Sequence, residues 1–475
     1  MSERALVLSL LRAGDALVHL PAIAALARPE RELHLLLQPA SRPVAELLAP
    51  YATLHFLPAN HAGDDPAPVA AALDALAAER FDVVFNLTHR TFAARLAARL
   101  GVARVVGLAA VGDRFTMTTP WFDYLNDWGC HAMTSVIHYG DVYCQAVGAP
   151  WTDPALRERL GLPTERAASE RPLVALQATT SEAKKSWPPA RWRALVVELR
   201  RRLPEARLVF LAAPSEREAV QAIAGEAEVA VCSLREAAAL LAEARLLVTG
   251  DTALVHLGAL VGAPVLLLSM GSSAFRELGP HGDGHVVLQA DLPCAPCAHD
   301  PGCLLGADHP CVREIDPAAA AFAAVALATG GEPPAGRGMI AWRAGRDGRG
   351  LLAFSPLGPR PVETAAIARL REHLLAALPV EVTGSPAAPT PEAVTDGERA
   401  TMAALAGALG ALGGWLGSGD RVALEAVFAK VEQPFCLEVL RAFALRARTA
   451  RERGGSLEPL RAEVARLERR LRAAA

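Results

Sequence analysis

The chain alternates short apolar runs with longer stretches in which apolar residues recur every three or four positions. A continuous apolar run of four to seven residues is typical of a buried strand, and the longer spacing is typical of an amphipathic helix. In the first part of the chain the predicted strands lie at 5–11, 33–37, 54–57, 82–87 and 105–107, and the predicted helices lie at 17–26, 44–48, 68–79 and 92–100. Strands that alternate with helices at this spacing predict a doubly wound parallel sheet.

A second alternating set follows a Pro-, Arg- and Glu-rich stretch at 149–171. Its predicted strands lie at 173–176, 208–211, 229–231, 246–248 and 265–268, and its predicted helices lie at 189–202, 216–223 and 234–244 and from 253 onward. We therefore expect an α/β fold with two Rossmann-like lobes, one over residues 1–150 and one over residues 172–329. A cleft between the two sheets would suit a two-lobed nucleotide-sugar transferase.

The pattern changes again after the second set. A Gly- and Pro-rich stretch at 330–338 precedes a predicted β-hairpin at 339–356, and the pattern is mainly helical from 364 onward. Residues 339–475 are therefore expected to be a hairpin plus an α-helical extension. The tail carries apolar residues at a/d spacing, namely Leu457, Leu460, Val464, Leu467 and Leu471. Such a seam predicts either a helix packed on its own domain or a helix that self-associates.

One strand–turn–helix unit carries the clearest chemical signal. The apolar run 246–248 ends at Thr249-Gly-Asp-Thr252, and a helix begins at Ala253. A helix N-terminus offers free N–H groups and partial positive charge, so this turn is a natural seat for a diphosphate. Asp251 and Thr252 lie in the turn, and His256 lies about one helical turn later and can point back to the same site.

Composition narrows the function classes. The 475 residues are 52% apolar and 21% charged with a net charge of −3, so a nucleic-acid-binding role is not expected. No apolar stretch reaches the length of a membrane span, and the first apolar run, between Arg4 and Arg12, fits a buried strand better than a signal peptide. We expect a cytoplasmic protein whose eight cysteines are reduced unless they hold a metal.

Four segments, in order, carry a family resemblance over about residues 4 to 325. They are RAGDALVHLPAIAAL at 12–26, ATTSEAKKSWPPARW at 178–192, GDTALVHLGALVGAP at 250–264 and CAPCAHDPGCLLGADHPC at 294–311. Together they resemble glycosyltransferase family 9, the heptosyltransferases of lipopolysaccharide core assembly.

The resemblance implies a GT-B architecture and inverting transfer of a heptose from ADP-heptose to the lipopolysaccharide inner core. The implied partners are the nucleotide-sugar donor and an anionic glycolipid acceptor, with peripheral association at the inner membrane. The extension keeps a protein (autotransporter-type) heptosyltransferase as an alternative function, and a non-catalytic scaffold derived from the family is a second alternative.

Asp15 follows Gly14 at a strand-to-helix turn. The resemblance implies that its carboxylate is the general base that takes the acceptor hydroxyl's proton. A plain helix N-cap is the alternative interpretation.

Two threonines and a lysine follow the strand at 173–176. Thr179, Thr180 and Lys185 would suit a diphosphate, and Lys185 matches the family lysine that neutralises the leaving group or binds the sugar. This chain has one extra residue between the threonines and that lysine, so Lys184 is a competing candidate.

The remaining donor-binding residues also follow from the resemblance. Glu218 matches a glutamate near the nucleoside ribose, and Cys232 matches a position that lines the adenine pocket. Asp251, Thr252 and His256 would bind the diphosphate and the sugar. Ala253 departs from the family, which usually has glycine there, and its methyl would hinder close approach of phosphate oxygens to the backbone.

No Asp-x-Asp pair occurs in the chain, so we expect transfer without a catalytic metal, with positive charge from Lys185, His256 and helix dipoles. A structural metal is a separate hypothesis. The cysteines of the last segment have ligand-like C-x2-C-x5-C-x7-C spacing for zinc or iron, and they are Cys294, Cys297, Cys303 and Cys311. Reduced, buried thiols are the alternative.

Overall fold

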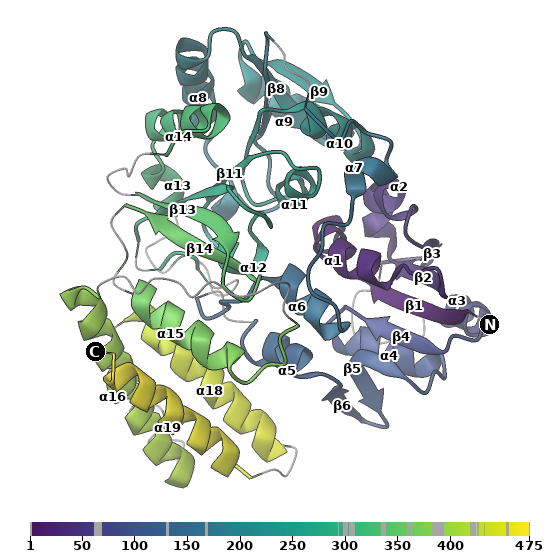
Figure 1. The fold of residues 1–475 in the computed structure, drawn as a ribbon, viewed down its shortest axis with the longest axis vertical. Coiled ribbons are helices and arrows are strands. Elements are labelled where there is room, and N and C mark those ends of the chain that lie inside the picture. The colour runs from purple at the N-terminus through teal and green to yellow at the C-terminus, as the bar shows by residue number, and fades with distance from the viewer. Residues whose placement is uncertain are drawn as a thin grey trace.

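The fold was examined in a computed structural model of the whole chain. The structure describes all residues except 1, 61–68, 130–132, 167–169, 293, 298–302, 304–308, 334–338, 359–360, 362, 382–393, 419–423, 425–426, 432, 453–455 and 475. Two α/β lobes and a group of C-terminal helices make up the molecule (Figure 1).

The first lobe is built on a six-stranded sheet of order β3-β2-β1-β4-β5-β6. Its strands are β1 (Glu3–Ser9), β2 (Arg31–Leu37), β3 (Thr53–Phe56), β4 (Val83–Asn86), β5 (Val105–Val111) and β6 (Arg114–Met117). Its helices are α1 (Ala13–Leu26), η1 (Pro39–Val44), α2 (Ala45–Leu48), α3 (Ala70–Ala77), α4 (Thr91–Arg99), α5 (Pro120–Asp127) and α6 (Tyr139–Ala146). Strands β1 to β5 pair in parallel as predicted, whereas the antiparallel edge strand β6 was not predicted.

The second lobe is built on an eight-stranded sheet of order β14-β13-β12-β11-β10-β7-β8-β9. Its strands are β7 (Leu173–Gln177), β8 (Arg207–Ala212), β9 (Glu228–Val231), β10 (Leu246–Thr249), β11 (Val265–Ser269), β12 (Val286–Ala290), β13 (Met339–Arg346) and β14 (Leu352–Leu357). The helices of this part are α7 (Leu156–Arg159), η3 (Ala183–Lys185), α8 (Pro189–Arg202), η4 (Pro214–Glu216), α9 (Arg217–Ala224), α10 (Leu234–Glu243), α11 (Ala253–Leu260), α12 (Phe275–Leu278), α13 (Cys311–Glu314) and α14 (Pro317–Thr329). The predicted hairpin forms as β13 and β14, and β13 pairs antiparallel with β12, so the hairpin extends this sheet. The two-lobed α/β fold expected from the resemblance is confirmed.

Local sequence explains why the central elements of the second lobe form. All five residues of β7 are buried, as expected for a strand covered by helices on both faces. In α8 the buried residues Trp192, Leu195, Val196 and Leu199 follow the i, i+3, i+4, i+7 spacing of one helix face. In α10, Ser233 and Glu236 form a reciprocal capping box at the N-terminus.

The C-terminal extension consists of α15 (Thr364–Leu375), α16 (Asp396–Ser418), α18 (Pro434–Glu452) and α19 (Glu458–Arg472), shown in green and yellow at the lower left of Figure 1. The apolar seam of α19 is buried inside this bundle, with Val464, Leu467 and Leu471 at most 1% exposed. The structure therefore favours the first interpretation of the seam, a helix packed on its own domain.

The extension also packs on the first lobe. Trp128, which follows α5, meets Phe443 of α18 edge to face at a ring-centroid distance of 5.1 Å. The Trp121 indole donates to the Pro379 carbonyl at 3.0 Å, and the Gln145 amide of α6 exchanges two hydrogen bonds with the backbone of Glu381. Helix α18 thus packs on α5, and the segment that follows α15 is bonded to α5 and α6.

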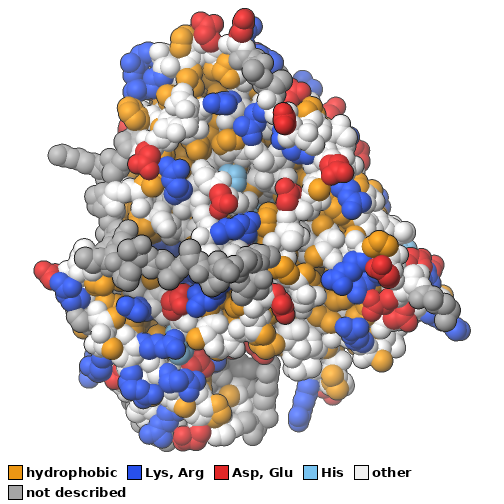
Figure 2. All heavy atoms as spheres, viewed as in Figure 1, with side chains coloured by type: hydrophobic (Ala, Val, Ile, Leu, Met, Phe, Trp, Pro, Cys, Tyr) orange, Lys and Arg blue, Asp and Glu red, His pale blue; other side chains and the backbone are white. Residues whose placement is uncertain are grey.

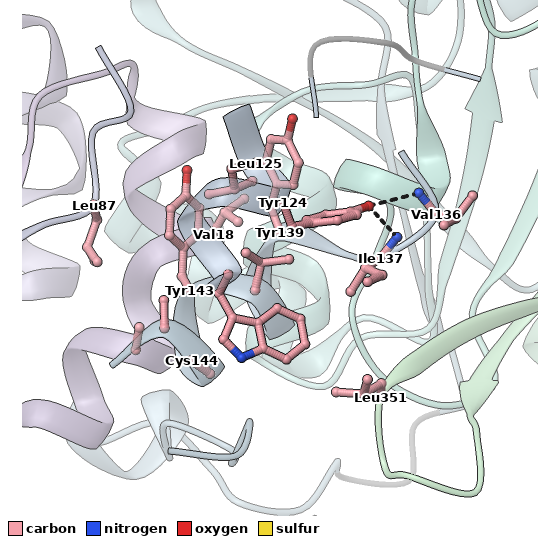
Figure 3. Packing of buried hydrophobic residues seen from close by; sticks show 14 of the residues in the cluster. Val18, Leu87, Tyr124, Leu125, Val136, Ile137, Tyr139, Tyr143, Cys144 and Leu351 are labelled. Atoms are coloured by element: carbon pink, nitrogen blue, oxygen red, sulfur yellow. Dashed lines mark hydrogen bonds between the residues drawn. The ribbon is translucent and has the colours of Figure 1, made fainter. Parts of the chain in front are cut away.

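Helix α6 lies between the two lobes (Figure 1). Its fully buried Asp141 accepts hydrogen bonds from His281 Nε2 and from the backbone N–H of Leu352, both at 2.8 Å. Figure 3 shows Tyr139 and Tyr143 of α6 close to Tyr124 of α5, whose hydroxyl oxygen accepts from the backbone N–H groups of Val136 and Ile137 at 3.0 Å each. One side of α6 is therefore bound to the loops and the hairpin of the second lobe.

Basic and acidic side chains are intermingled over both lobes on the face shown in Figure 2, and Lys and Arg side chains also gather over the C-terminal helices. Among the residues that the structure describes, no helix combines the length and apolar content that crossing a bilayer requires.

Candidate active site

Asp15 lies in the first turn of α1, close to the second lobe. Its Oδ2 accepts a hydrogen bond from the backbone N–H of Arg12 at 3.0 Å, so Asp15 also helps to cap the N-terminus of α1. Burial raises the pKa of the Asp15 carboxyl above its ordinary value, the Arg12 N–H and guanidinium oppose the shift, and Asp251 of the second lobe adds to it. A carboxylate with a raised pKa is a stronger base, and its sensitivity to Asp251 places the two predicted site residues near each other.

Lys185 is the lysine that reaches the predicted donor site. Its Nζ lies 2.8 Å from Asp251 Oδ2, and both side chains are largely buried. Lys184 instead pairs with Glu182 at 3.4 Å. Of the two candidate lysines, Lys185 therefore reaches Asp251 and Lys184 pairs with Glu182 instead. Both lie in the short helical turn η3.

Two glycines allow the segment after β7 to lie against the neighbouring turns. At Gly271 the backbone φ is +57°, and a Cβ would come within 2.3 Å of the Lys184 carbonyl oxygen. At Gly250 a Cβ would lie 3.0 Å from the Thr180 methyl carbon. The Thr180 hydroxyl faces its own loop, where it donates to the Glu182 carbonyl at 2.9 Å or bonds to Ser186. Thr180 thus shapes this loop in the ligand-free chain.

The N-terminus of α11 faces the Gly14 turn of the first lobe. Thr252 is the N-cap, and its hydroxyl oxygen accepts from the Leu254 N–H at 3.3 Å. A Cβ built on Gly14 would lie 3.7 Å from Ala253 Cα and 3.8 Å from its methyl carbon. The two predicted halves of the site are therefore in van der Waals reach, and the Ala253 methyl lies at the contact between the lobes.

His256 lies in α11 and is 9% exposed. Burial lowers the pKa of His256 to about 4, so its imidazole is neutral at neutral pH. The expectation that His256 supplies positive charge is therefore wrong for the ligand-free chain; it can serve as a neutral hydrogen-bonding group. It lines a cavity of about 20 Å³ with residues of α1, α6 and α11 and with His281.

The two remaining donor-binding candidates lie at the edge of this arrangement. Glu218 is exposed in the first turn of α9, and Cys232 is half-buried after β9. Glu216, two residues before Glu218, accepts a hydrogen bond from the Thr179 hydroxyl at 2.7 Å. The sequence did not indicate Glu216 or Gln177, because a single Glu in a short helical turn and a single Gln at a strand end have no distinctive spacing.

The four cysteines of the predicted metal loop lie near one another. Burial, and then the proximity of Cys311, Cys294 and Cys303, raises the pKa of the Cys297 thiol to about 11. Within the described ranges, however, no three His, Cys, Asp or Glu side chains are arranged so that they could hold a metal ion. The structure brings the thiols into one loop but does not assemble a metal centre from them.

Together these residues form a site with a carboxylate on one side and a helix N-terminus with a lysine on the other. Asp15 comes from the first lobe, and Lys185, Asp251 and Thr252 come from the carboxyl ends of β7 and β10. In a ligand-free chain the Lys185 ammonium is held by Asp251, so an incoming anion would compete with that carboxylate for the same cation. The arrangement can hold an anionic leaving group and accept a proton across the contact between the lobes.

Comparison with known proteins identifies relatives. The sequence pattern described as glycosyltransferase family 9 (heptosyltransferase) matches residues 69–306. Lipopolysaccharide heptosyltransferase 1 of Pseudomonas aeruginosa is 32% identical over 226 residues, which is 46% of this chain. The match spans 62% of the length of that relative.

Two solved structures align with this chain, and the first shares its fold. A glycosyl transferase family 9 protein from Veillonella parvula has a TM-score of 0.52 at 18% identity, covering 70% of this chain and 98% of that protein. The E. coli ADP-heptose LPS heptosyltransferase II has a TM-score of 0.49 at 15% identity, covering 69% of this chain and 99% of that protein.

Proposed function

Because this chain belongs to glycosyltransferase family 9, we propose that it transfers a heptose from ADP-heptose to an acceptor hydroxyl of the lipopolysaccharide inner core. The observation that carries the proposal is the approach of the Asp15 turn to the N-terminus of α11, where Lys185 and Asp251 meet. The relative from Pseudomonas aeruginosa, named a lipopolysaccharide heptosyltransferase, supports heptose and a lipopolysaccharide acceptor.

We propose a single inverting displacement. The acceptor hydroxyl oxygen attacks the anomeric carbon, and Asp15 takes the hydroxyl proton as the new carbon–oxygen bond forms. The bond between that carbon and the β-phosphate oxygen breaks, and the electron pair leaves with ADP. The N–H groups of the first turn of α11, together with Lys185, stabilise the negative charge that develops on the leaving diphosphate.

This mechanism needs no metal ion, because Lys185 and the helix N-terminus supply the positive field. In the ligand-free chain Gly14 lies close to Ala253, so the Ala253 methyl lies where the Asp15 turn approaches the N-terminus of α11. The Ala253 methyl then limits how closely the phosphate oxygens approach the backbone. We propose that the enzyme acts on the cytoplasmic side of the inner membrane, at its surface.

A transfer assay tests the proposal. The full chain would be incubated with ADP-heptose, a UDP-sugar or a GDP-sugar and with lipopolysaccharide that lacks core heptose, and products would be read by mass spectrometry. We expect addition of one heptosyl unit from ADP-heptose only. Absence of transfer from every donor would overturn the proposal.

A pair of variants separates catalysis from helix capping. Asp15→Asn should lower kcat by about 10²- to 10⁴-fold, since the general base is lost. Asp316→Asn is the matched control, because Asp316 caps α14 through the Ala319 N–H at 3.0 Å and lies outside the site. Equal rates for Asp15→Asn and wild type would contradict the assignment of the base.

A structural zinc or iron ion at the four-cysteine loop is kept as a separate proposal. It rests on the C-x2-C-x5-C-x7-C spacing of the thiols alone, since the described side chains are not arranged as a metal site, and it plays no part in the transfer step. Metal analysis of the purified chain should find about one ion per chain, lost in Cys294→Ser. Metal-free protein with normal thermal stability would refute it.

A further inference from the structure

Gln177 is the last residue of β7 and is 5% exposed. It lies at the carboxyl end of the second sheet, between the turn that carries Thr179 and the turn that carries Thr252. A buried primary amide has two donor hydrogens and one acceptor oxygen, and leaving them unpaired costs free energy. Its partners therefore show what the residue does.

The amide oxygen of Gln177 binds the turn after β10. Its Oε1 accepts from the Thr252 hydroxyl at 3.2 Å and lies 3.0 Å from the Thr249 hydroxyl, which donates either to it or to the Gly250 carbonyl at 2.8 Å. When Thr252 donates its proton to Gln177, its oxygen keeps lone pairs for the Leu254 N–H, which it accepts at 3.3 Å. Gln177 thus orients the hydroxyl that caps the N-terminus of α11.

The amide nitrogen of Gln177 binds the turn after β7. Its Nε2 donates to the Thr179 hydroxyl oxygen at 2.8 Å and to the Thr179 carbonyl. The Thr179 hydroxyl proton is then directed to Glu216 Oε1 at 2.7 Å, and Glu216 Oε2 accepts from the Ala213 N–H at 2.9 Å. One directional chain of hydrogen bonds therefore runs across the ends of β10, β7 and β8.

We propose that Gln177 is a positioning residue for the donor diphosphate, holding the Thr252 and Thr179 turns at the spacing that the diphosphate requires. This inference rests on the function proposed above. A neutral amide is suited to the position, because it accepts from one threonine while donating to the other. An ionised carboxylate could only accept, and it would add negative charge beside Glu216 and the bound diphosphate.

Three variants of the full chain test the proposal. Gln177→Met removes both hydrogen-bonding functions at similar volume, and Gln177→Glu keeps the shape but ionises. Gln289→Met is the matched control: Gln289 is a buried amide near the end of β12 that accepts from the Trp342 indole at 3.1 Å, outside the site. The readouts are kcat and KM for ADP-heptose and calorimetric titration with ADP.

We expect Gln177→Met to raise the KM for ADP-heptose about 5- to 10-fold and to weaken ADP binding by a similar factor, with a smaller change in kcat. We expect Gln177→Glu to be the weaker variant at about pH 8 and to recover relative to wild type toward about pH 5.5, because burial beside Glu216 raises the pKa of the introduced carboxyl and its protonated form regains one donor and one acceptor of the amide. A purely structural role would not produce this relative recovery.

The outcomes distinguish the two proposals. If wild type neither binds ADP nor turns over ADP-heptose, the proposed function fails. If wild type is active and Gln177→Met matches Gln289→Met in KM, the positioning role is overturned. Should Gln177→Met melt below the assay temperature, the pH dependence of Gln177→Glu relative to wild type decides, and a flat ratio overturns the role.

Discussion

Replacing Glu463 with glutamine should loosen the C-terminal helix α19 by an amount that depends on pH. Glu463 accepts two hydrogen bonds from the Arg446 guanidinium, at 2.7 and 2.8 Å, and lies 3.6 Å from His373 Nε2. Arg446 also pairs with Asp127 of the first lobe at 2.9 Å. The carboxylate thus belongs to a cluster that ties the extension to α5.

The magnitude follows from the pKa of Glu463. Burial on its own would raise this pKa, but hydrogen bonds from His373 and Arg446 outweigh it and lower the pKa from 4.5 to about 2. A lowering of this size corresponds to about 3 kcal/mol of stability at neutral pH. Because the folded-state pKa is depressed, the stabilisation is fully present above pH 4.5 and is lost as the pH falls toward 2.

Hydrogen exchange of the full chain, read peptide by peptide over α18 and α19, measures this stability locally. Glu463→Gln should speed exchange of α19 about 30- to 150-fold above pH 5, and the difference from wild type should shrink below pH 4.5. Glu458→Gln is the control, since Glu458 is exposed on the same helix and pairs with Arg461 at 3.5 Å. Equal exchange in the two variants, or a difference that grows as the pH falls, would refute the electrostatic reasoning.

Three further outcomes can be checked. Lys185→Met should lower kcat/KM for ADP-heptose at least about 100-fold in protein that is still folded at the assay temperature, because the cation facing α11 is lost; steady-state kinetics would show it. Leu467→Ala should cost about 2–5 kcal/mol in denaturant unfolding without changing the oligomeric state seen in light scattering, since this side chain is fully buried within its own chain. Gly271→Ala should lower the melting temperature much more than Gly284→Ala, because both glycines have positive φ but only the first would bring a Cβ onto the Lys184 carbonyl.

The alternating parallel strands of both lobes, with the exception of β12 (Val286–Ala290), could be predicted from the sequence, because buried strands between helices form continuous apolar runs. Strand β6 was missed because Arg114 and Thr116 interrupt any such run at the sheet edge, where one side needs no apolar cover. Helices α5 and α6 were missed because they are aromatic and short, and because elements distant in sequence bury them: α6 packs mainly on α1 and α5, and α5 also packs on α18.

The candidate site could be predicted only where residue type and spacing were both distinctive. The turn with Asp251 and the Gly14-Asp15 turn met this condition, and the structure brings them together. The protonation state of His256 could not be predicted, because it depends on burial by α1 and α6 rather than on its neighbours in sequence. Gln177 was equally hidden, since its hydrogen bonds join strand ends that are adjacent only in the fold.

The extension has a consequence for how the lobes move. The chain leaves the second sheet at β14, bonds to α6 through the segment after α15 and packs α18 on α5, and α6 is itself bonded to the second lobe through Asp141. The two lobes are therefore connected twice, once by the covalent linker between them and once through the extension. Two connections allow the lobes fewer relative motions than a single hinge would allow. Less conformational entropy therefore remains to be lost when the lobes close on a ligand. Tighter ligand binding at an unchanged set of contacts is the expected thermodynamic result.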